Sequence, residues 1–354
     1  MLGLEPEKVR IDASRAVSRG SSLRVSAAGH AFVLEPLSDA SAGRVAVAAS
    51  RLAAARVARR RRSIPVVAVP FMGEAGASVC AAHGVSWFDL SGNARIVAPG
   101  LRVLIGGREN KFRRVGRPST VFAPKTARVV RWLLAHAGTA VTQRELARAV
   151  GLSEGFVSRI VSRLVDEEFV ARLDGPDGRG AGRGEGEDFG AGRRGKPPIQ
   201  LRDAGVLLDA WRDAYRFTNH TIIRGHLPVR TSSELVGSIA SALSRAGVEH
   251  AATGLAAAWL LDGFAGFRLA TFFVDHEAPG ELLAGLGFRD DPRGANVWLA
   301  IPNDAGVFSG AVARDGIRCV HPVQAYVDLA AHPERASDAA EHLRASILGA
   351  SHDG

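Results

Sequence analysis

The stretch TQRELARAVGLSEGFVSRIVSRLVDEEFV, residues 142–170, determines the fold expected for the middle of this chain. Thr142 and Glu145 have the spacing of a capping box, in which each side chain accepts a hydrogen bond from the other residue's backbone amide at a helix start. The turn Gly151-Leu152 should end this helix, and Ser153 can cap a second helix over residues 154–168. The second helix has apolar residues at helical spacing on its inward face: Val157, Ile160, Val161 and Leu164. Two short helices joined by a tight turn predict a helix-turn-helix unit.

A further helix is expected before this pair, over residues 124–137, and Gly138 should end it. Its apolar residues share one face: Ala127, Val130, Leu133 and Leu134. After the pair, residues 169–173 and 198–202 have the character of two short strands, and a helix follows over residues 203–217. The Gly-rich segment between the strands has no hydrophobic periodicity, so residues 174–197 should form a long, mobile hairpin tip.

Length and composition set the wider frame. A chain of 354 residues with 46% hydrophobic and 23% charged residues is globular and should hold two or three domains, at about 100 to 200 residues each. Lys plus Arg is 45 against 36 for Asp plus Glu, a net charge of +9, and 41 of the 45 are Arg. An Arg-rich surface favours anionic partners, nucleic acid first, although a general compositional habit of the source genome would give the same excess.

No segment of the sequence indicates export or a membrane. Cys80 and Cys319 do not form a metal-binding or disulfide pattern, and the N-terminus lacks an apolar signal core. The most apolar stretch, residues 254–261, is eight residues long, whereas a membrane span needs about 20. We therefore expect a soluble, cytoplasmic protein without membrane contact.

The regions on either side of the centre mix strands and helices. In residues 1–116 we expect helices over 39–60 and 74–83 and strands over 23–34, 64–69, 85–90, 94–97 and 101–105. In residues 218–354 we expect helices over 233–246, 254–264 and 281–286, strands over 248–252, 268–275 and 296–301, a hairpin of 307–313 with 317–320, and closing helices from about Val323 and Ser337. The predicted fold class is thus a multidomain α/β protein, in which a central winged helix-turn-helix (residues 117–217) is flanked by two α/β domains.

The central stretch resembles the winged helix-turn-helix of bacterial transcriptional regulators of the MarR kind. The resemblance implies that the third helix enters the major groove of double-stranded DNA, where arginines contact guanine edges or phosphates. Hydroxyl groups and helix N-termini suit phosphates. The candidate DNA-binding residues are Thr142, Gln143, Arg144, Ser153, Glu154, Gly155, Ser158, Arg159, Ser162, Arg163, Arg193, Arg194 and Lys196. The alternative is that the two helix arginines only solvate an amphipathic helix.

Two other basic segments are open to more than one interpretation. The hairpin tip has five basic and five acidic residues, so its basic end could enter a minor groove as a wing, or the tip could be a tolerated insertion. The four arginines at residues 59–62 stand at the expected end of a helix, where the helix dipole favours cations, and accessory DNA contact is the alternative.

The N-terminal region, with the segment VSWFDLSGNARI, resembles a restriction-endonuclease-like domain. Active nucleases of that fold need an Asp on one strand and an acidic-x-Lys on the next, because the carboxylates hold the metal. Here Asp89 is followed by Asn93-Ala94-Arg95, so the catalytic set is missing. We expect Asp89 and Asn93 to fix the turn through hydrogen bonds to its backbone.

The C-terminal region, with HAATGLAAAWLLDGFAGFRLATFFVDHE, resembles the C-terminal domain of abortive-infection antitoxins, which is related to nucleotidyltransferases. Thr253-Gly254 stands where an active enzyme has Gly-Ser, but the following strand has Arg268, Ala270 and Phe272 in place of the metal-binding Asp-x-Asp. The cluster Asp275-His276-Glu277 should not bind a metal, since neighbouring side chains on a strand point to opposite faces. His321, before Pro322, is expected to cap or pack. No metal and no cofactor are predicted.

These observations predict a sequence-specific, double-stranded-DNA-binding transcriptional regulator, a repressor that binds as a homodimer and has no enzyme activity. The flanking domains would serve dimerisation or contact a toxin or a small-molecule effector. One alternative is an antitoxin of a toxin–antitoxin or phage-defence operon. The other is a DNA-processing nuclease or nucleotidyltransferase, which the missing carboxylates disfavour.

Overall fold

The computed structural model describes residues 10–12, 22–27, 29–58, 63–112, 121–173, 196–263, 266–278, 280–291, 293–329 and 336–350. The chain folds into two compact units. The first consists of residues 1–119, 162–171 and 205–213, and the second of residues 120–161, 172–204 and 214–354. The first unit therefore includes the end of the central region's third helix and most of the helix after its hairpin.

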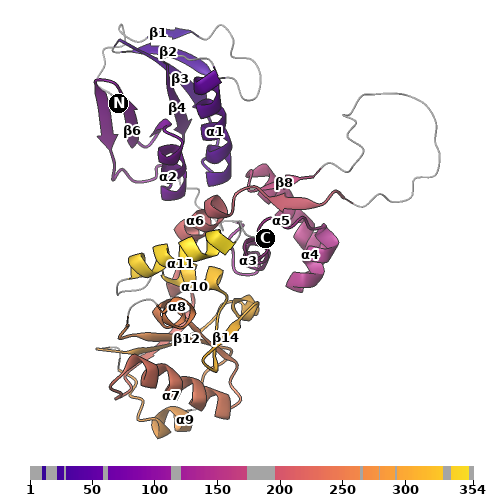
Figure 1. Ribbon diagram of the computed structural model, residues 1–354, viewed down its shortest axis with the longest axis vertical. Helices are drawn as coiled ribbons and strands as arrows, with labels where there is room; N and C mark the ends of the chain where they lie inside the picture. The colour runs from indigo at the N-terminus through magenta and orange to yellow at the C-terminus, as the bar shows by residue number, and fades with distance from the viewer. Residues whose placement is uncertain are drawn as a thin grey trace, which may run out of the picture. The chain divides into compact units, whose positions relative to one another are not determined.

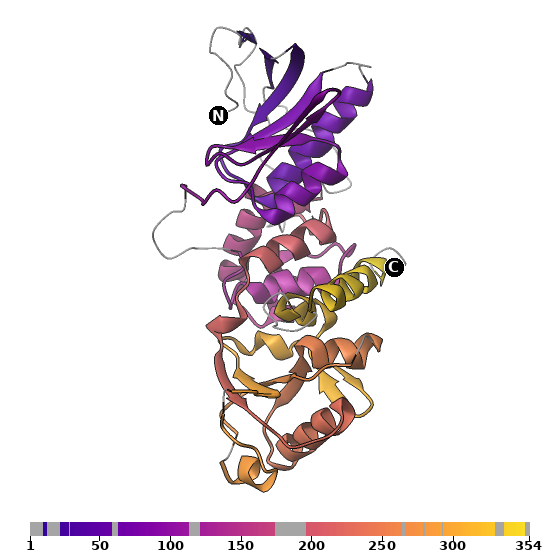
Figure 2. The same cartoon turned by 90° about the vertical axis from the view of Figure 1, so that its left-hand side faces the viewer.

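The first unit is built on a seven-stranded sheet in the order β1-β2-β3-β4-β5-β6-β7 (Figure 1). Strands β3, β4 and β5 run parallel to one another and the remaining neighbours are antiparallel. The strands are β1 (Arg10–Asp12), β2 (Leu23–Ala27), β3 (His30–Pro36), β4 (Ile64–Val69), β5 (Ser86–Asp89), β6 (Ala94–Ala98) and β7 (Leu101–Ile105). Helices α1 (Ala42–Ala58) and α2 (Glu74–Ala82) lie on the same face of the sheet (Figure 2).

Alternation along the central strands divides the apolar residues of this sheet between its two faces. Val67 and Val69 of β4 pack with Val45 and Leu52 of α1 and with other residues of the helix-covered face. Ile64 and Val66 of the same strand belong to a second apolar cluster on the opposite face. This is the period-2 pattern of a strand with both faces buried.

One expected strand of this region is a hairpin. The sequence predicted a single strand over residues 23–34, but β2 and β3 pair antiparallel with Ala27 opposite His30. The chain reverses at Gly29, whose φ of +74° favours glycine. The weak alternation continued through the turn and therefore hid it.

The central region has the predicted order of elements. Helices α3 (Ala127–Ala135), α4 (Gln143–Val150) and α5 (Glu154–Asp166) are followed by β8 (Val170–Arg172) and β9 (Ile199–Leu201), which form a two-stranded sheet, and then by α6 (Ala204–Ala214). The residues predicted to face inward on α3 and α5 are all buried. Most of the predicted hairpin tip, residues 174–195, lies outside the described residues, as do the four arginines at residues 59–62.

The second unit also contains a six-stranded mixed sheet in the order β10-β13-β12-β11-β15-β14. Its strands are β10 (Thr221–Gly225), β11 (His250–Thr253), β12 (Ala270–Val274), β13 (Val297–Ile301), β14 (Val312–Arg314) and β15 (Ile317–Cys319). Its helices are α7 (Ser232–Arg245), α8 (Gly254–Asp262), α9 (Gly280–Gly285), α10 (Pro322–Leu329) and α11 (Ala336–Ala350). Helices α7 and α8 lie on opposite faces of the sheet (Figures 1 and 2). The observed class is α/β with a central winged helix, as predicted.

Two details of this sheet differ from the sequence prediction. Strand β10 was not predicted, because most of its side chains are exposed or half-buried and do not alternate. Residues 307–311 were expected to extend the strand of the last hairpin, but Val307 lies in a 3-10 turn, η3 (Ala305–Phe308). Asp304 starts this turn, because its Oδ1 accepts a hydrogen bond from the amide of Gly306 at 2.8 Å. Within the described residues, no helix is both long and apolar enough to cross a membrane.

Candidate DNA interface

The start of α4 is fixed by the predicted capping box. The amide of Glu145 donates to Thr142 Oγ1 at 3.3 Å, and the amide of Thr142 donates to Glu145 Oε2 at 2.9 Å. This second bond is the main cause of the lowered pKa of Glu145. Gly151, with φ +64°, ends the helix in the left-handed conformation. The short connection to α5 therefore follows from local chemistry, and it sets the geometry of the helix-turn-helix.

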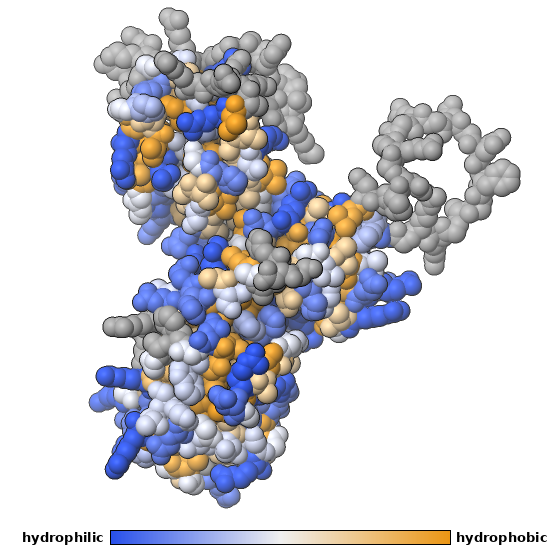
Figure 3. All heavy atoms as spheres, in the orientation of Figure 1, coloured by the Kyte–Doolittle hydropathy of each residue, from blue (hydrophilic) through white to orange (hydrophobic). Residues whose placement is uncertain are grey.

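Helix α5 separates an apolar face from a polar one. Val157, Val161 and Leu164 are completely buried, which fixes the helix on the core. On the other side, Glu154, Gly155 and Arg159 are exposed, and three further predicted residues are half-buried: Ser158, Ser162 and Arg163. In Figure 3, hydrophilic side chains project from the part of the winged helix that contains α4. The α5 residues predicted to contact DNA thus lie on its exposed and half-buried side.

Contacts along this stripe distinguish its charged residues. Arg144 Nε lies 3.2 Å from Glu154 Oε1, and Arg163 Nε lies 2.8 Å from Glu167 Oε1. The guanidinium of Arg159 lies over the ring of Phe156, 5.7 Å from its centroid. Among the described residues no ion pair involves Arg159. Within the part of the chain that the structure describes, no carboxylate balances the charge of Arg159 directly, unlike that of Arg163 on the same helix.

A second cation shares the ring of Phe156. Lys125, just before α3, has its Nζ 5.5 Å from the ring centroid, so Phe156 holds cations from two separate segments. Neither Lys125 nor Phe156 was among the residues predicted from the sequence. The i,i+3 spacing of Phe156 and Arg159 on α5 is a local signal that could have indicated the first contact. No local pattern indicates Lys125, because only the packing of α3 against the helix pair brings it to α5.

The hairpin stem adds another cation. Lys196 Nζ donates to Ser158 Oγ at 2.6 Å, in the middle of α5. Leu173 and Pro198 are joined by a backbone hydrogen bond of 2.8 Å, which places Lys196 at the base of the predicted wing. Lys196, Ser158, Arg159 and Lys125 therefore belong to one basic surface that we call the α5 surface.

Some predicted site residues do not belong to the α5 surface. Gln143 is only 9% exposed, so it is a packing residue of α4, and its prediction as a DNA contact is corrected. It was included because it stands at a helix start, but its side chain turns inward. Arg193 and Arg194 lie outside the described residues.

The Asp89 carboxylate of the first unit is committed to its own turn. Its Oδ1 accepts hydrogen bonds from the amides of Gly92 and Asn93 at 2.8 and 2.9 Å, and its Oδ2 accepts from the amide of Met72 and the Asn93 side chain at 3.2 and 2.9 Å. The predicted turn-fixing role of Asp89 and Asn93 is confirmed. With four donors on a buried carboxylate, Asp89 has little acceptor capacity left for a metal.

In the second unit, a buried polar cluster links the winged helix to the C-terminal region. Arg131 of α3 donates to Gln324 Oε1 at 2.5 Å, and Gln324 Nε2 donates to Asp328 Oδ1 at 2.8 Å, both on α10. Tyr215 donates to the same Asp328 oxygen at 2.5 Å, and Thr253 donates to the other. Burial raises the pKa of Asp328 to about 7, against the opposing effect of these hydrogen bonds. The sequence did not indicate this cluster.

Two other predictions for the C-terminal region can be placed. His321 Nδ1 accepts a hydrogen bond from the amide of Val323 at 3.2 Å, which is the capping role expected before α10. His276 Nδ1 lies 2.7 Å from Asp275 Oδ1, so these two side chains do not point to opposite faces as expected, because β12 ends at Val274 before them. Within the described residues, no group of three or more His, Cys, Asp or Glu side chains could hold a metal ion.

Comparison with known protein families agrees with this geometry. Residues 123–180 match the family model described as the MarR family, which covers α3, the helix pair and β8. The central region is thus similar to the MarR family, and this similarity implies a DNA-binding regulator of transcription. No curated protein and no solved structure matches the chain significantly.

Proposed function

We propose that this chain is a sequence-specific repressor that binds double-stranded DNA through the α5 surface. Arg159 is the proposed base-contacting residue, since it is exposed on α5 and forms no ion pair with the residues that the structure describes. Lys196, Ser158 and Lys125 are the proposed phosphate contacts. The single observation that carries this proposal is the convergence of cations from three segments on the exposed side of one helix.

The other candidate residues take supporting roles in this proposal. Thr142, Ser153 and Gly155 stand at helix starts, where backbone amides and hydroxyls suit a phosphate. Arg144 is held by Glu154, so it would have to leave that ion pair to contact DNA. Arg193 and Arg194 remain predicted wing contacts.

A homodimer completes the proposal. A short recognition helix presents few base-contacting side chains, and helix-turn-helix proteins therefore commonly bind two half-sites one helical turn apart. We expect an inverted repeat with that spacing, with the flanking domains providing the dimer contacts or binding a toxin or small effector. The protein would act in the cytoplasm, on its own operator or a nearby one.

The test selects a preferred duplex from random DNA with the full chain and then compares variants on that duplex. Arg159→Ala should weaken binding by about 1 to 3 kcal/mol and flatten discrimination between sequences, as expected for a base contact. Arg245→Ala is the matched control, because it removes the same charge from an exposed position on α7. Selection without any enriched sequence, or equal losses for Arg159→Ala and Arg245→Ala, would contradict the proposal.

A further inference from the structure

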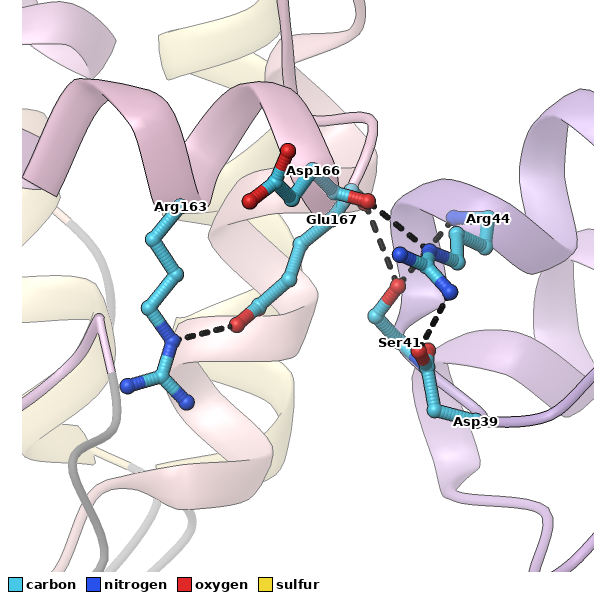
Figure 4. A network of polar contacts seen from close by, with 6 residues as sticks. All are labelled: Asp39, Ser41, Arg44, Arg163, Asp166 and Glu167. Atoms are coloured by element: carbon cyan, nitrogen blue, oxygen red, sulfur yellow. Dashed lines mark hydrogen bonds and ion pairs between the residues drawn. The ribbon is translucent and has the colours of Figure 1, made fainter.

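The C-terminal turn of α5 ends against the N-terminus of α1, and both belong to the first unit (Figure 4). Ser41 Oγ donates to the carbonyl oxygen of Glu167 at 3.1 Å, and Arg44 Nε donates to the carbonyl oxygen of Asp166 at 2.8 Å. The last carbonyls of a helix have no partner within it. Two of them are therefore satisfied here by side chains of the N-terminal domain.

Arg44 is itself held in place for this role. Its Nη1 lies 2.5 Å from Asp39 Oδ2, and Asp39 Oδ1 accepts a hydrogen bond from the amide of Ser41 at 3.2 Å. The cation stands at the negative end of the α5 dipole, and the positive end of the α1 dipole lies at the same place. The joint is thus electrostatically complementary as well as hydrogen-bonded.

Gly43 makes this approach possible. A Cβ on Gly43 would collide with the backbone carbonyl of Glu167 and would lie 2.8 Å from the carbonyl carbon of Glu168. Both are backbone atoms, so no side-chain rotation could relieve the clash. Gly43 lies in the first turn of α1 and does not have a positive φ, so its backbone conformation does not require glycine. The close contact with the end of α5 is the reason that glycine is needed there.

The same turn of α5 reaches a candidate DNA-binding residue. Glu167 follows directly on α5, and its carboxylate holds Arg163 Nε at 2.8 Å. The Glu167 side chain points away from Ser41 and Arg44 toward Arg163, and burial is the main cause of its raised pKa (Figure 4). Ser41 and Arg44 therefore fix the backbone of Asp166 and Glu167, and the Glu167 side chain in turn holds Arg163.

A second contact ties the N-terminal domain to the helix after the hairpin. The amide of Ala75, in the first turn of α2, donates to Asp213 Oδ2 of α6 at 2.8 Å. Asp213 carries the negative charge that a helix N-terminus favours. The N-terminal ends of α1 and α2 thus each donate a hydrogen bond to an acceptor on the winged helix, and all of these groups belong to the first unit.

We propose that Ser41, Gly43 and Arg44 are positioning residues for DNA recognition, through which the N-terminal domain sets the end of α5 and the orientation of Arg163. This inference rests on the proposed function. In it the N-terminal domain takes part in selecting the DNA sequence without touching the bases. Any partner of that domain that displaced α1 would change DNA selectivity.

A pair of glycine substitutions in the full chain tests the joint. Gly43→Ala should lower affinity for the selected duplex by about tenfold, within the usual range for coupled sites, with less than about a twofold change on an unrelated duplex. Gly237→Ala is the matched control: Gly237 is also helical, in α7, and a Cβ there meets nothing within 4 Å. Both substitutions favour the helical conformation, so a difference between them reports the contact with α5.

The double variant Ser41→Ala, Arg44→Ala removes the two side-chain hydrogen bonds without a clash, and Arg56→Ala on the exposed side of α1 is its charge control. The ratio of affinities for the selected and unrelated duplexes should fall in the double variant and stay unchanged in the control. Unchanged ratios in both Gly43→Ala and the double variant would overturn the proposal. An equal loss on both duplexes that follows a lowered melting temperature would also overturn it, as a role in folding only. If Arg159→Ala still abolishes selectivity, the proposed function stands independently.

Discussion

The ammonium group of Lys196 lies 2.6 Å from the hydroxyl oxygen of Ser158. Lys196 stands at the base of the hairpin and Ser158 on the polar side of α5, so one contact joins the two parts of the winged helix that we propose to meet DNA. An ammonium group on a hydroxyl oxygen keeps two further donors and its full charge. In the proposed function, this pair would contact a phosphate from both sides of the junction.

Lys196→Ala should weaken binding to all duplexes alike, because a phosphate contact has no sequence preference. The slope of log K against log salt should become shallower by about 1. Titrations at several salt concentrations measure this slope, and Lys111→Ala, an exposed lysine of the N-terminal domain, is the control. A selective loss on the preferred duplex would mean that Lys196 contacts a base.

Phe156→Leu should weaken binding to the preferred duplex, because the ring that orients Arg159 is lost while the apolar volume is largely kept. The expected cost is about 0.5 to 1 kcal/mol, the worth of a cation–π contact near a surface. A double-mutant cycle with Arg159→Ala measures the coupling. Additive effects of the two substitutions would show that Phe156 does not act through Arg159.

No metal-dependent cleavage of DNA is expected, because the Asp89 carboxylate is saturated by backbone and amide donors. Asp89→Asn should instead lower the free energy of unfolding by about 1 to 3 kcal/mol, since an amide NH2 would face donors within the turn. Denaturant titration measures the stability change, and incubation of the parent protein with duplex DNA and Mg²⁺ or Mn²⁺ checks for cleavage. Cleavage that disappears in Asp89→Asn would contradict this view.

The sequence predicted those features whose causes are local. The capping box of Thr142 and Glu145 depends on two residues within four positions, and the buried face of α5 depends on helical periodicity. The turn at Asp89 likewise depends on residues within a few positions of the carboxylate. Each of these appears in the structure as predicted.

Features that depend on distant residues were not predicted. Ser41 caps Glu167 across 126 positions and Arg44 caps Asp166 across 122, and no short motif encodes such a pair. Lys125 reaches Phe156 only through the packing of α3. Strand β10 and the turn at Gly29 were missed for a different reason. Strands β10 and β3 are only partly buried, so the pattern of apolar residues in each says little about which side chains face the core.

Acid should destabilise the second unit through His220. This histidine is 7% exposed, and burial, with a smaller effect of Arg131, lowers its pKa to about 4. Its Nδ1 accepts a hydrogen bond from the amide of Asn303 at 3.2 Å. Its Nε2 lies 2.8 Å from the hydroxyl of Tyr215, which donates to Asp328. The neutral ring, with its proton on Nε2, therefore satisfies both partners, and a proton on Nδ1 would remove the acceptor from Asn303.

An unfolded histidine has a pKa of about 6.5, so the unfolded chain binds the proton first as the pH falls. The stability from neutral His220 is fully present above about pH 6.5 and is lost as the pH falls through about 4, by roughly 3 kcal/mol. The raised pKa of Asp328 acts in the opposite direction, because it lowers stability as the pH rises towards 7. Denaturant titrations of the parent and His220→Gln between pH 4 and pH 8 separate the two effects, since Asp328 is common to both proteins. The parent should lose more stability than His220→Gln towards low pH, and parallel curves would show that His220 is protonated in the folded state or plays no part in the acid transition.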